Sequence, residues 1–446
     1  MKVKKRIAIL LISILFISLS GCDGSKMEND SSSAEGENTT FNINLNFSSI
    51  TAPGKKSLLK STGDPNATEA EAKVKTVDVF IYGESGYYIS HTSLSVTDFT
   101  QVGGSGTSDK YQYASTTKIP ATTGSKKLFV AVNLPPGMAT ALEDKPSNEL
   151  TQVAQTLTAN DLVATDGSIV MTSTELLTYE FVKNGAANNP TISVERMVAK
   201  VTAQKAANMV QAGVPGTLFD MRFAINNFNS KSYFIQGVAP DFKDPNWDVY
   251  TASDFSKASA NDYIPVNEPN VTDTKNLNAL YAAENTSQNH REKEITRAQV
   301  RAGFLPATVV IYQGGGYISV TSASQGKTAP QTFYTITLNQ PEPQTYCFFD
   351  RATAESYAVA NGKTAANIVT YTDGISYWDM YLNKGVWDVL RNDYYKCTIT
   401  RILIPGRPTD DPTDPDNPPA SDVDITINVE VVYWNDPVLG NYELEP

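Results

Sequence analysis

The sequence has 446 residues, of which 41% are hydrophobic and 19% are charged, a composition typical of a chain that folds around a core. Lys and Arg total 36 against 48 Asp and Glu, so the net charge is −12 at pH 7. An acidic surface repels phosphate backbones, and we therefore expect no nucleic-acid partner. Two histidines and three cysteines leave few ligands for a metal, so we predict no metal site and no cofactor.

The first 21 residues have the make-up of a secretory signal. Basic residues 2–6 precede thirteen apolar or serine residues, 7–19, too few for a bilayer crossing that needs about 20 residues of helix. Leu19-Ser20-Gly21-Cys22 then resembles a bacterial lipobox. We predict a lipoprotein signal peptide at 1–21, an acylated Cys22 and outer-membrane lipid as a partner. The alternative is an ordinary signal peptide with a chance cysteine. The small polar residues of 22–40 predict a disordered tether.

Residues 41–49 alternate apolar and polar side chains, as in a strand with one buried face. The apolar positions are Phe41, Ile43, Leu45 and Phe47. A loose stretch with Lys55, Lys56 and Lys60 follows. We therefore expect residues 41–60 to form an amphipathic strand and a loop behind it.

Short β-branched and aromatic runs bounded by Gly, Pro, Asn and Asp make up most of the remaining chain, which favours strands. Helical patterns are confined to 148–156, 288–301 and 352–360. We predict an all-β fold with a few short helices, arranged as two antiparallel β-sandwich domains. The loop before residue 191 divides an N-terminal domain, 61–190, from a C-terminal domain, 191–404.

Two cysteines, Cys347 and Cys397, lie within runs that are typical of strands. An exported chain permits a disulfide between them, provided that the fold brings their Cα atoms to about 5.5 Å. Two buried free thiols are equally compatible with the sequence, so both alternatives stay open.

The C-terminal part of the chain begins with a segment, 405–420, that contains six prolines and four aspartates and predicts an extended spacer outside any sheet. Beyond it, within the region 421–446, one more amphipathic strand is expected. Its apolar face consists of Val423, Ile425, Ile427, Val429, Val431 and Tyr433. The simplest interpretation is that this strand pairs within its own domain and that the spacer is a long loop. Together with 41–49, however, it suggests a strand that can leave and another that can replace it, the logic of donor-strand complementation.

Two blocks of sequence resemble the fimbrillin family of Bacteroidetes bacteria, the lipoprotein precursors of major and minor fimbriae. ISVERMVAKVTAQ, at 192–204, is similar to the strand that opens the second domain in that family. The block 377–434 is similar to the family's end, with Arg391-Asn392, an alternating strand, a Pro-rich spacer and a last strand that ends in tryptophan. The lipobox and KKLFVAVNLP add weaker support.

The resemblance implies a mechanism of assembly. Such precursors reach the outer membrane as lipoproteins, a trypsin-like surface protease removes the N-terminal strand, and the vacated groove accepts the C-terminal strand of another subunit. By resemblance, 41–49 is the removable strand and 423–434 is the donor. Because no arginine occurs between Arg6 and Arg196, cleavage would fall at Lys55, Lys56 or Lys60. The implied partners are other copies of the chain and accessory fimbrial subunits.

Signals of catalysis are weak. Gly326-Lys327-Thr328 and Gly362-Lys363-Thr364 lack the earlier glycine of a phosphate-binding loop, and neither histidine stands in a recognisable catalytic constellation. We predict that the chain is not an enzyme but a structural subunit of extracellular fimbriae that supports adhesion. The alternative is a glycan-binding surface lipoprotein or a fimbrial tip adhesin, because the 22 tyrosines and four tryptophans could stack on sugars.

Overall fold

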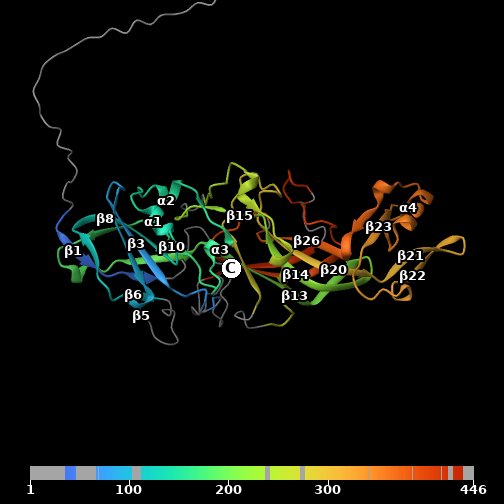
Figure 1. Cartoon of the computed structure of the whole chain (residues 1–446), viewed down its shortest axis with the longest axis horizontal. Helices are drawn as coiled ribbons and strands as arrows, with labels where there is room; N and C mark the ends of the chain where they lie inside the picture. Colours follow the sequence, from blue (N-terminus) through green and yellow to red (C-terminus); the bar gives the residue numbers. More distant parts are fainter. Residues whose placement is uncertain are drawn as a thin grey trace, which may run out of the picture.

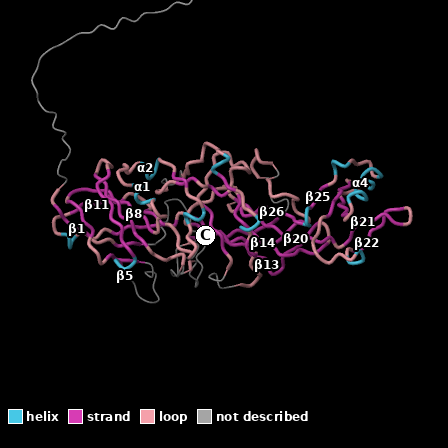
Figure 2. Tube along the Cα trace, viewed as in Figure 1, coloured by secondary structure: helices cyan, strands magenta, loops and turns pink. Residues whose placement is uncertain are grey.

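The computed structural model of the chain describes residues 36–46, 67–68, 70–102, 112–236, 242–271, 277–339, 341–383, 385–412, 414–419 and 425–434. Two β-rich regions follow one another along the long axis of the molecule, and a smaller module projects beyond the second (Figure 1). Strands dominate, and the helices are short (Figure 2). The predicted signal peptide, Cys22, Phe47, the three candidate lysines and Val423 lie outside the described residues. In the described part of the chain, no helix is long and apolar enough to span a membrane.

The N-terminal region is built on one large sheet with the strand order β4-β3-β8-β10-β12-β2-β6-β5, in which β11 also pairs with β8. Along a strand of this sheet, successive side chains alternate between two apolar cores. Val77, Val79 and Ile81 of β3 pack into one, and Phe80 and Tyr82 of the same strand pack into the other. Three short helices, α1 (Met138–Leu142), α2 (Glu149–Gln152) and α3 (Ala159–Leu162), contribute leucines to the second core. The strands are β1 (Asn38–Phe41), β2 (Asn44–Asn46), β3 (Thr76–Gly83), β4 (Tyr88–Ser95), β5 (Phe99–Val102), β6 (Gln112–Ser115), β7 (Ile119–Thr122), β8 (Gly124–Val132), β10 (Met171–Ser173), β11 (Leu177–Phe181) and β12 (Thr191–Arg196).

The C-terminal region is a sandwich of two four-stranded sheets, β19-β13-β27-β28 and β18-β14-β20-β26, which share a single apolar core. Val201 of β13 and Ile399 of β27 meet Phe223 of β14, Val300 of β20 and Trp378 of β26 in this core. The strands are β13 (Val198–Gly213), β14 (Gly216–Asn226), β18 (Ile264–Pro265), β19 (Ala279–Ala283), β20 (Arg297–Pro306), β26 (Ile375–Tyr381), β27 (Asp393–Ile404) and β28 (Ile425–Tyr433).

The projecting module has its own small core, which includes Ile336, Phe348 and Ala358. It consists of the hairpin β21–β22, the sheet β24-β23-β25 and helix α4. Gly314 and Gly315 both have positive φ at the hairpin turn, a backbone conformation that residues with a Cβ rarely adopt. The elements are β21 (Thr308–Gln313), β22 (Gly316–Thr321), β23 (Phe333–Leu338), β24 (Gln344–Phe348), α4 (Arg351–Ala360) and β25 (Val369–Tyr371).

The two main regions are continuous with each other. Strands β12 and β13 are separated by Met197 alone, and one apolar core joins residues of the first region, such as Phe129, to residues of the second, such as Tyr394. A short pair, β9 (Gln155–Thr156) with β16 (Lys231–Ser232), also connects them. The two regions therefore share one apolar core at their junction, in addition to the core that each has of its own.

The predicted fold class is confirmed, with corrections of detail. Two strand pairs, β2 with β12 and β13 with β27, are parallel, because long stretches of chain separate the partners and allow a crossover. The boundary between the regions falls at Met197, since β12 pairs with β10 and β2 of the N-terminal region, so residues 191–196 do not belong to the second domain. Part of the segment predicted as a tether is ordered, because β1 begins at Asn38.

Of the helices predicted at 352–360 and 288–301, the structure contains the first but not the second. The helix expected at 352–360 is present as α4. The helix expected at 288–301 is wrong: residues from Arg297 onward form β20, in which Ala298, Val300 and Ala302 are buried with period two. Burial between β14 and β26 overrides the helical propensity of the charged residues there.

The cysteine alternatives are resolved in favour of thiols. Cys347 on β24 and Cys397 on β27 are both free and buried. Burial raises the pKa of each thiol to about 12, so neither is a reactive thiolate near neutral pH.

Candidate functional site

The N-terminal strand is enclosed by its own domain. β1 pairs with β7, and β2 lies between β12, to which it is parallel, and β6, to which it is antiparallel. Phe41, Ile43 and Leu45 are 0% exposed and pack into the core of the sheet. Its second part, β2, is an interior strand that is paired on both sides.

Further side-chain and backbone contacts hold the strand. Asn42 Nδ2 donates to the carbonyl oxygen of Ser115 at 2.8 Å, and Phe41 packs against Phe181 with 4.9 Å between ring centroids. Asn188 Nδ2 donates to the carbonyl oxygen of Thr40 at 3.1 Å. Removal of the strand would leave an apolar slot next to Ile192 and unpaired edges on β12 and β6.

The C-terminal strand occupies the opposite kind of position. Among the described residues, β28 pairs antiparallel with β27 only and forms the edge of the sheet β19-β13-β27-β28. Ile425 is buried, whereas Ile427 and Val429 are half-buried against the core of the sandwich. The strand therefore pairs within its own chain, and its other edge has no strand partner in the part of the chain that the structure describes.

The residue after β28, Trp434, is fully buried at the junction of the two regions. Its ring stacks on Tyr281 at 5.5 Å between centroids, and the guanidinium of Arg196 lies 4.7 Å from the ring centroid. Its indole Nε1 donates to Glu71 Oε2 at 3.3 Å. Trp434 thus ties the end of the C-terminal strand to residues of the N-terminal region.

Glu71 is the centre of this junction. Its side chain is buried and lies 2.9 Å from Lys200 Nζ, and Tyr281 donates its hydroxyl to Glu71 Oε1 at 2.7 Å. Burial works to raise the pKa of Glu71, but the charge of Lys200 and the hydrogen bonds from Lys200, the Thr68 amide and Tyr281 outweigh it and lower that pKa. Glu71 is therefore held as a carboxylate.

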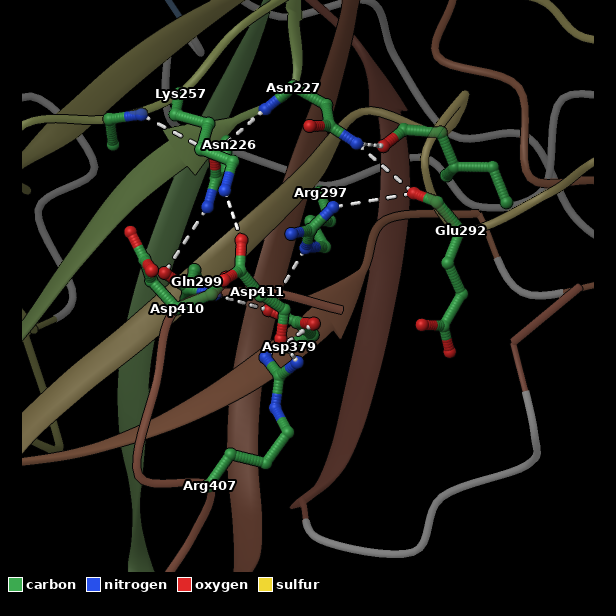
Figure 3. A network of polar contacts seen from close by, with 12 residues as sticks. Asn226, Asn227, Lys257, Glu292, Arg297, Gln299, Asp379, Arg407, Asp410 and Asp411 are labelled. Carbon is green, nitrogen blue, oxygen red and sulfur yellow. Dashed lines mark hydrogen bonds and ion pairs between the residues drawn. The ribbon is translucent and has the colours of Figure 1, made fainter. Parts of the chain in front are cut away.

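The spacer between β27 and β28 folds back on the C-terminal region (Figure 3). Arg407 Nη2 lies 2.6 Å from Asp379 Oδ2 on β26, and the other oxygen of this carboxylate lies 3.0 Å from Arg297 Nε on β20. Gln299 donates from Nε2 to the Asp410 carbonyl oxygen at 2.9 Å. The start of the spacer is thus fixed to a buried polar cluster.

Further contacts hold the acidic part of the spacer. Asp411 pairs with Lys257, and Asp416 pairs with Lys293. The backbone N–H of Glu292 donates to the carbonyl oxygen of Asn417 at 2.9 Å. Because Ile402 near the end of β27 is paired with Ile425 at the start of β28, the spacer leaves and returns at the same end of the sheet.

The other predicted site residues divide into two groups. Val431 and Tyr433 pair with β27 through the backbone. Cys22, Lys55, Lys56, Lys60, Phe47 and Val423 lie outside the described residues. The Glu71–Lys200–Trp434 cluster and the Arg297–Asp379–Arg407 cluster were not predicted from the sequence. A charged residue inside an apolar alternating run, such as Lys200 within β13, was the available signal.

Among the described residues, no group of side chains is arranged to hold a metal ion. The buried polar clusters consist of ion pairs and hydrogen bonds between residues of the chain. The two terminal strands are therefore the features to which we assign a function.

Two family models match the sequence. The model described as major fimbrial subunit protein (FimA) matches residues 42–211, and the model described as major fimbrial subunit protein type IV, fimbrillin, C-terminal, matches residues 369–438. No match is found among curated proteins.

Solved structures of similar chains include a fimbrilin (FimA) from Porphyromonas gingivalis W83, with 15% identity, coverage of 89% of this chain and 97% of the other, and a TM-score of 0.46. The tip fimbrial protein Mfa3 from Porphyromonas gingivalis, with a C-terminal truncation, has 13% identity, coverage of 89% and 100%, and a TM-score of 0.40. A fimbrial assembly protein from Parabacteroides distasonis ATCC 8503 has 14% identity, coverage of 81% and 92%, and a TM-score of 0.37.

Proposed function

We propose that this chain, which belongs to the fimbrillin family of major fimbrial subunit proteins, is exported as a lipoprotein precursor and polymerises into a cell-surface fimbrium by protease-triggered strand exchange. The family is one of structural fimbrial subunits and not of enzymes. The finer steps, which are lipidation at Cys22, cleavage at Lys55, Lys56 or Lys60, and strand donation by 423–434, are our proposal.

The observation that carries the proposal is the interior position of β2 between β12 and β6. Leu45 of β2, Ile43 just before it and Phe41 at the end of β1 are fully buried, and burial of such side chains stabilises a fold by roughly 1.5–3 kcal/mol each, or on the order of 5–9 kcal/mol together, as an upper bound. A domain that loses this strand has a strong drive to fill the slot with another apolar strand.

The C-terminal strand is suited to be that replacement. It alternates apolar and polar residues as the N-terminal strand does, and it is an edge strand with a single pairing partner. A released spacer of 16 residues at ~3.1 Å per residue would span roughly 50 Å. Donation from one subunit to the next is a heterologous contact that does not close on itself, so repetition yields a filament.

The proposed partners follow from these steps. The precursor would be held on the outer membrane by its acylated Cys22 until a trypsin-like surface protease cuts after one of the candidate lysines. The mature chain would then join other copies of itself and accessory subunits in an extracellular fimbrium.

The test is to express residues 23–446, treat the protein with trypsin under native conditions, and follow its N-terminal sequence and its size together. We expect loss of residues up to Lys55, Lys56 or Lys60, accompanied by laddered oligomers. A triple variant, Lys55→Ala with Lys56→Ala and Lys60→Ala, is the control and should stay intact and monomeric. A clipped chain that remains monomeric would contradict the proposal.

Deletion of 423–434 separates the donor from the acceptor. The truncated chain should be clipped normally but form no homopolymer, while a chain that still polymerises would contradict the donor assignment.

A Cys22→Ser variant tests anchoring in cells, where the precursor should leave the outer-membrane fraction. Unchanged fractionation would contradict the lipoprotein step.

A second candidate function, glycan binding, is favoured by the tyrosines of the projecting module. Tyr312 is 60% exposed, and its ring begins a chain of edge-to-face contacts through Tyr317 and Tyr357, with centroid distances of 5.1 and 5.0 Å. Exposed aromatic rings can stack on sugars. A glycan array probed with the intact chain and with Tyr312→Ala tests this candidate, and binding that survives the substitution would count against this site.

A further inference from the structure

We infer that Trp434 and Glu71 form a latch that keeps the C-terminal strand in its own subunit, and that its opening is a step distinct from the removal of the N-terminal strand. This inference rests on the proposed function in so far as β28 is the donor strand.

The contacts of Trp434 differ from those of β28. The strand pairs on one side, and its residues Ile427 and Val429 are only half-buried. Trp434, in contrast, is 0% exposed, stacks on Tyr281 and donates its indole N–H to Glu71. The most deeply buried contact of the C-terminal segment is therefore at its far end, next to the pair formed by Tyr433 and Asp393 of β27.

Departure of Trp434 would uncover charges that its ring now covers. Arg196 lies over the ring at 4.7 Å, and Lys200 lies 5.8 Å from its centroid. The buried Glu71–Lys200 pair, at 2.9 Å, would lose the aromatic wall that excludes water from it. A buried ion pair depends on such packing, so the strand cannot leave without a rearrangement of this junction.

Glu71 also belongs to the segment that follows the predicted cleavage loop. The Thr68 backbone N–H donates to Glu71 Oε2 at 2.7 Å, and Arg196 Nε donates to the Glu71 carbonyl oxygen at 3.1 Å. Ala67, Ala72 and Val74 on either side are buried. One residue thus contacts both the end of the C-terminal strand and the chain that continues from the N-terminal strand.

A merely structural role for the junction would stabilise both regions equally, and the chain offers a control for it. Glu284 is a second buried carboxylate paired with a cation, Arg391, at 2.9 Å, and its side chain also accepts a hydrogen bond from Gln236 Nε2, so both of these polar partners lie outside β28. Glu284→Gln therefore removes the same kind of charge as Glu71→Gln without touching the latch.

The test is amide hydrogen exchange on the unprocessed chain, residues 23–446, read by mass spectrometry. In Trp434→Ala we expect exchange in β28 to rise at least tenfold relative to exchange in β20. Glu71→Gln should give a smaller rise of the same selectivity, and Trp434→Phe, which keeps a stacking ring, should give the smallest. Glu284→Gln should change β20 and β28 by the same factor.

Equal changes in β20 and β28 for the Trp434 and Glu71 variants would overturn the latch. Because Trp434→Phe preserves most of the ring, it gives a readable result even if Trp434→Ala fails to fold. The deletion of 423–434 tests the donor role separately: polymerisation of that truncated chain would contradict the proposed function and leave the exchange result standing.

Discussion

The two terminal strands of this chain are alike in sequence pattern and opposite in structural position. The N-terminal strand, residues 38–46, lies inside its domain, with Phe41, Ile43 and Leu45 fully buried and partners on both sides of β2. The C-terminal strand, β28, lies at the edge of its sheet with one partner. Besides its ladder with β27, it is held by Trp434 at one end and by the docked spacer at the other.

The difference separates two ways of keeping a strand in place. An interior strand is held by apolar burial along its whole length, so it leaves only at the cost of the core. An edge strand held at its two ends can leave once a few specific contacts are broken. In the proposed assembly, the first strand would need a protease and the second would need only an opening step.

The largest expected effect is the difference in stability between two matched substitutions, one in each terminal strand. Ile43→Ala, at a fully buried position, should lower the free energy of unfolding by about 2–5 kcal/mol. Ile427→Ala, at a half-buried position of the edge strand, should lower it by about 1 kcal/mol. Urea unfolding followed by circular dichroism measures both. Equal losses would show that the two strands are held alike.

Acid should loosen the C-terminal strand before the N-terminal one. Glu71 has a pKa lowered from its ordinary 4.5, since Lys200 and three hydrogen-bond donors outweigh the effect of burial. An acid whose folded-state pKa is lowered stabilises the fold fully above its unfolded pKa, and this stabilisation is lost as the pH falls through the folded value. Hydrogen exchange corrected for intrinsic rates should therefore show β28 losing protection below about pH 4 while β1 and β2 keep theirs.

Glu71→Gln is the control for the acid effect, because it removes the titrating group. In that variant, the relative protection of β28 and β2 should no longer depend on pH in this range. A persistent difference would assign the effect to other carboxylates.

Salt should weaken the ion pairs that hold the spacer but not the apolar contacts that hold the N-terminal strand. Both side chains of the Lys257–Asp411 pair are exposed, as is Asp416 of the Lys293–Asp416 pair, and exposed pairs contribute about 0.2–1 kcal/mol each and are screened by salt. Lys257→Ala with Lys293→Ala should speed cleavage of the spacer by endoproteinase Asp-N by about two- to fivefold at low salt. Lys183→Ala, which removes an exposed pair with Glu37 next to β1, should leave the spacer rate unchanged.

The smallest expected effect is that of a reductant. Cys347 and Cys397 are free thiols, so no disulfide between them holds either strand in place. The melting temperature should be the same with and without dithiothreitol, and a thiol reagent at pH 8 should label neither cysteine before unfolding. A reductant-dependent shift of the melting temperature would contradict this assignment.

The sequence predicted the local features of both strands because period-two alternation reflects a buried face. It could not predict that β2 is parallel to β12, since pairing is decided by residues far apart in the chain. The expected helix at 288–301 fails for a similar reason. Arg297 and Gln299, residues with good helix propensity, are buried in β20, where both contact Asp379 from β26.

The Trp434 junction shows the same limit for a functional feature. Glu71 and Trp434 are 363 residues apart, so no local pattern links them. Lys200 within an apolar run indicated that a buried partner must exist, but its identity required the fold.

The near-uninterrupted run of β12 and β13, residues 191–213 with Met197 between the strands, has a mechanical consequence. A pull applied to one end of the subunit passes to the other through one extended backbone whose ladder bonds share the load, and no hinge separates the two regions. In a fibre of such subunits, bending would be confined to the joints, where the spacer crosses from one molecule to the next. The subunits would be stiff, and the sixteen residues rich in proline and aspartate would set the spacing at each joint as an extended, semi-rigid connector.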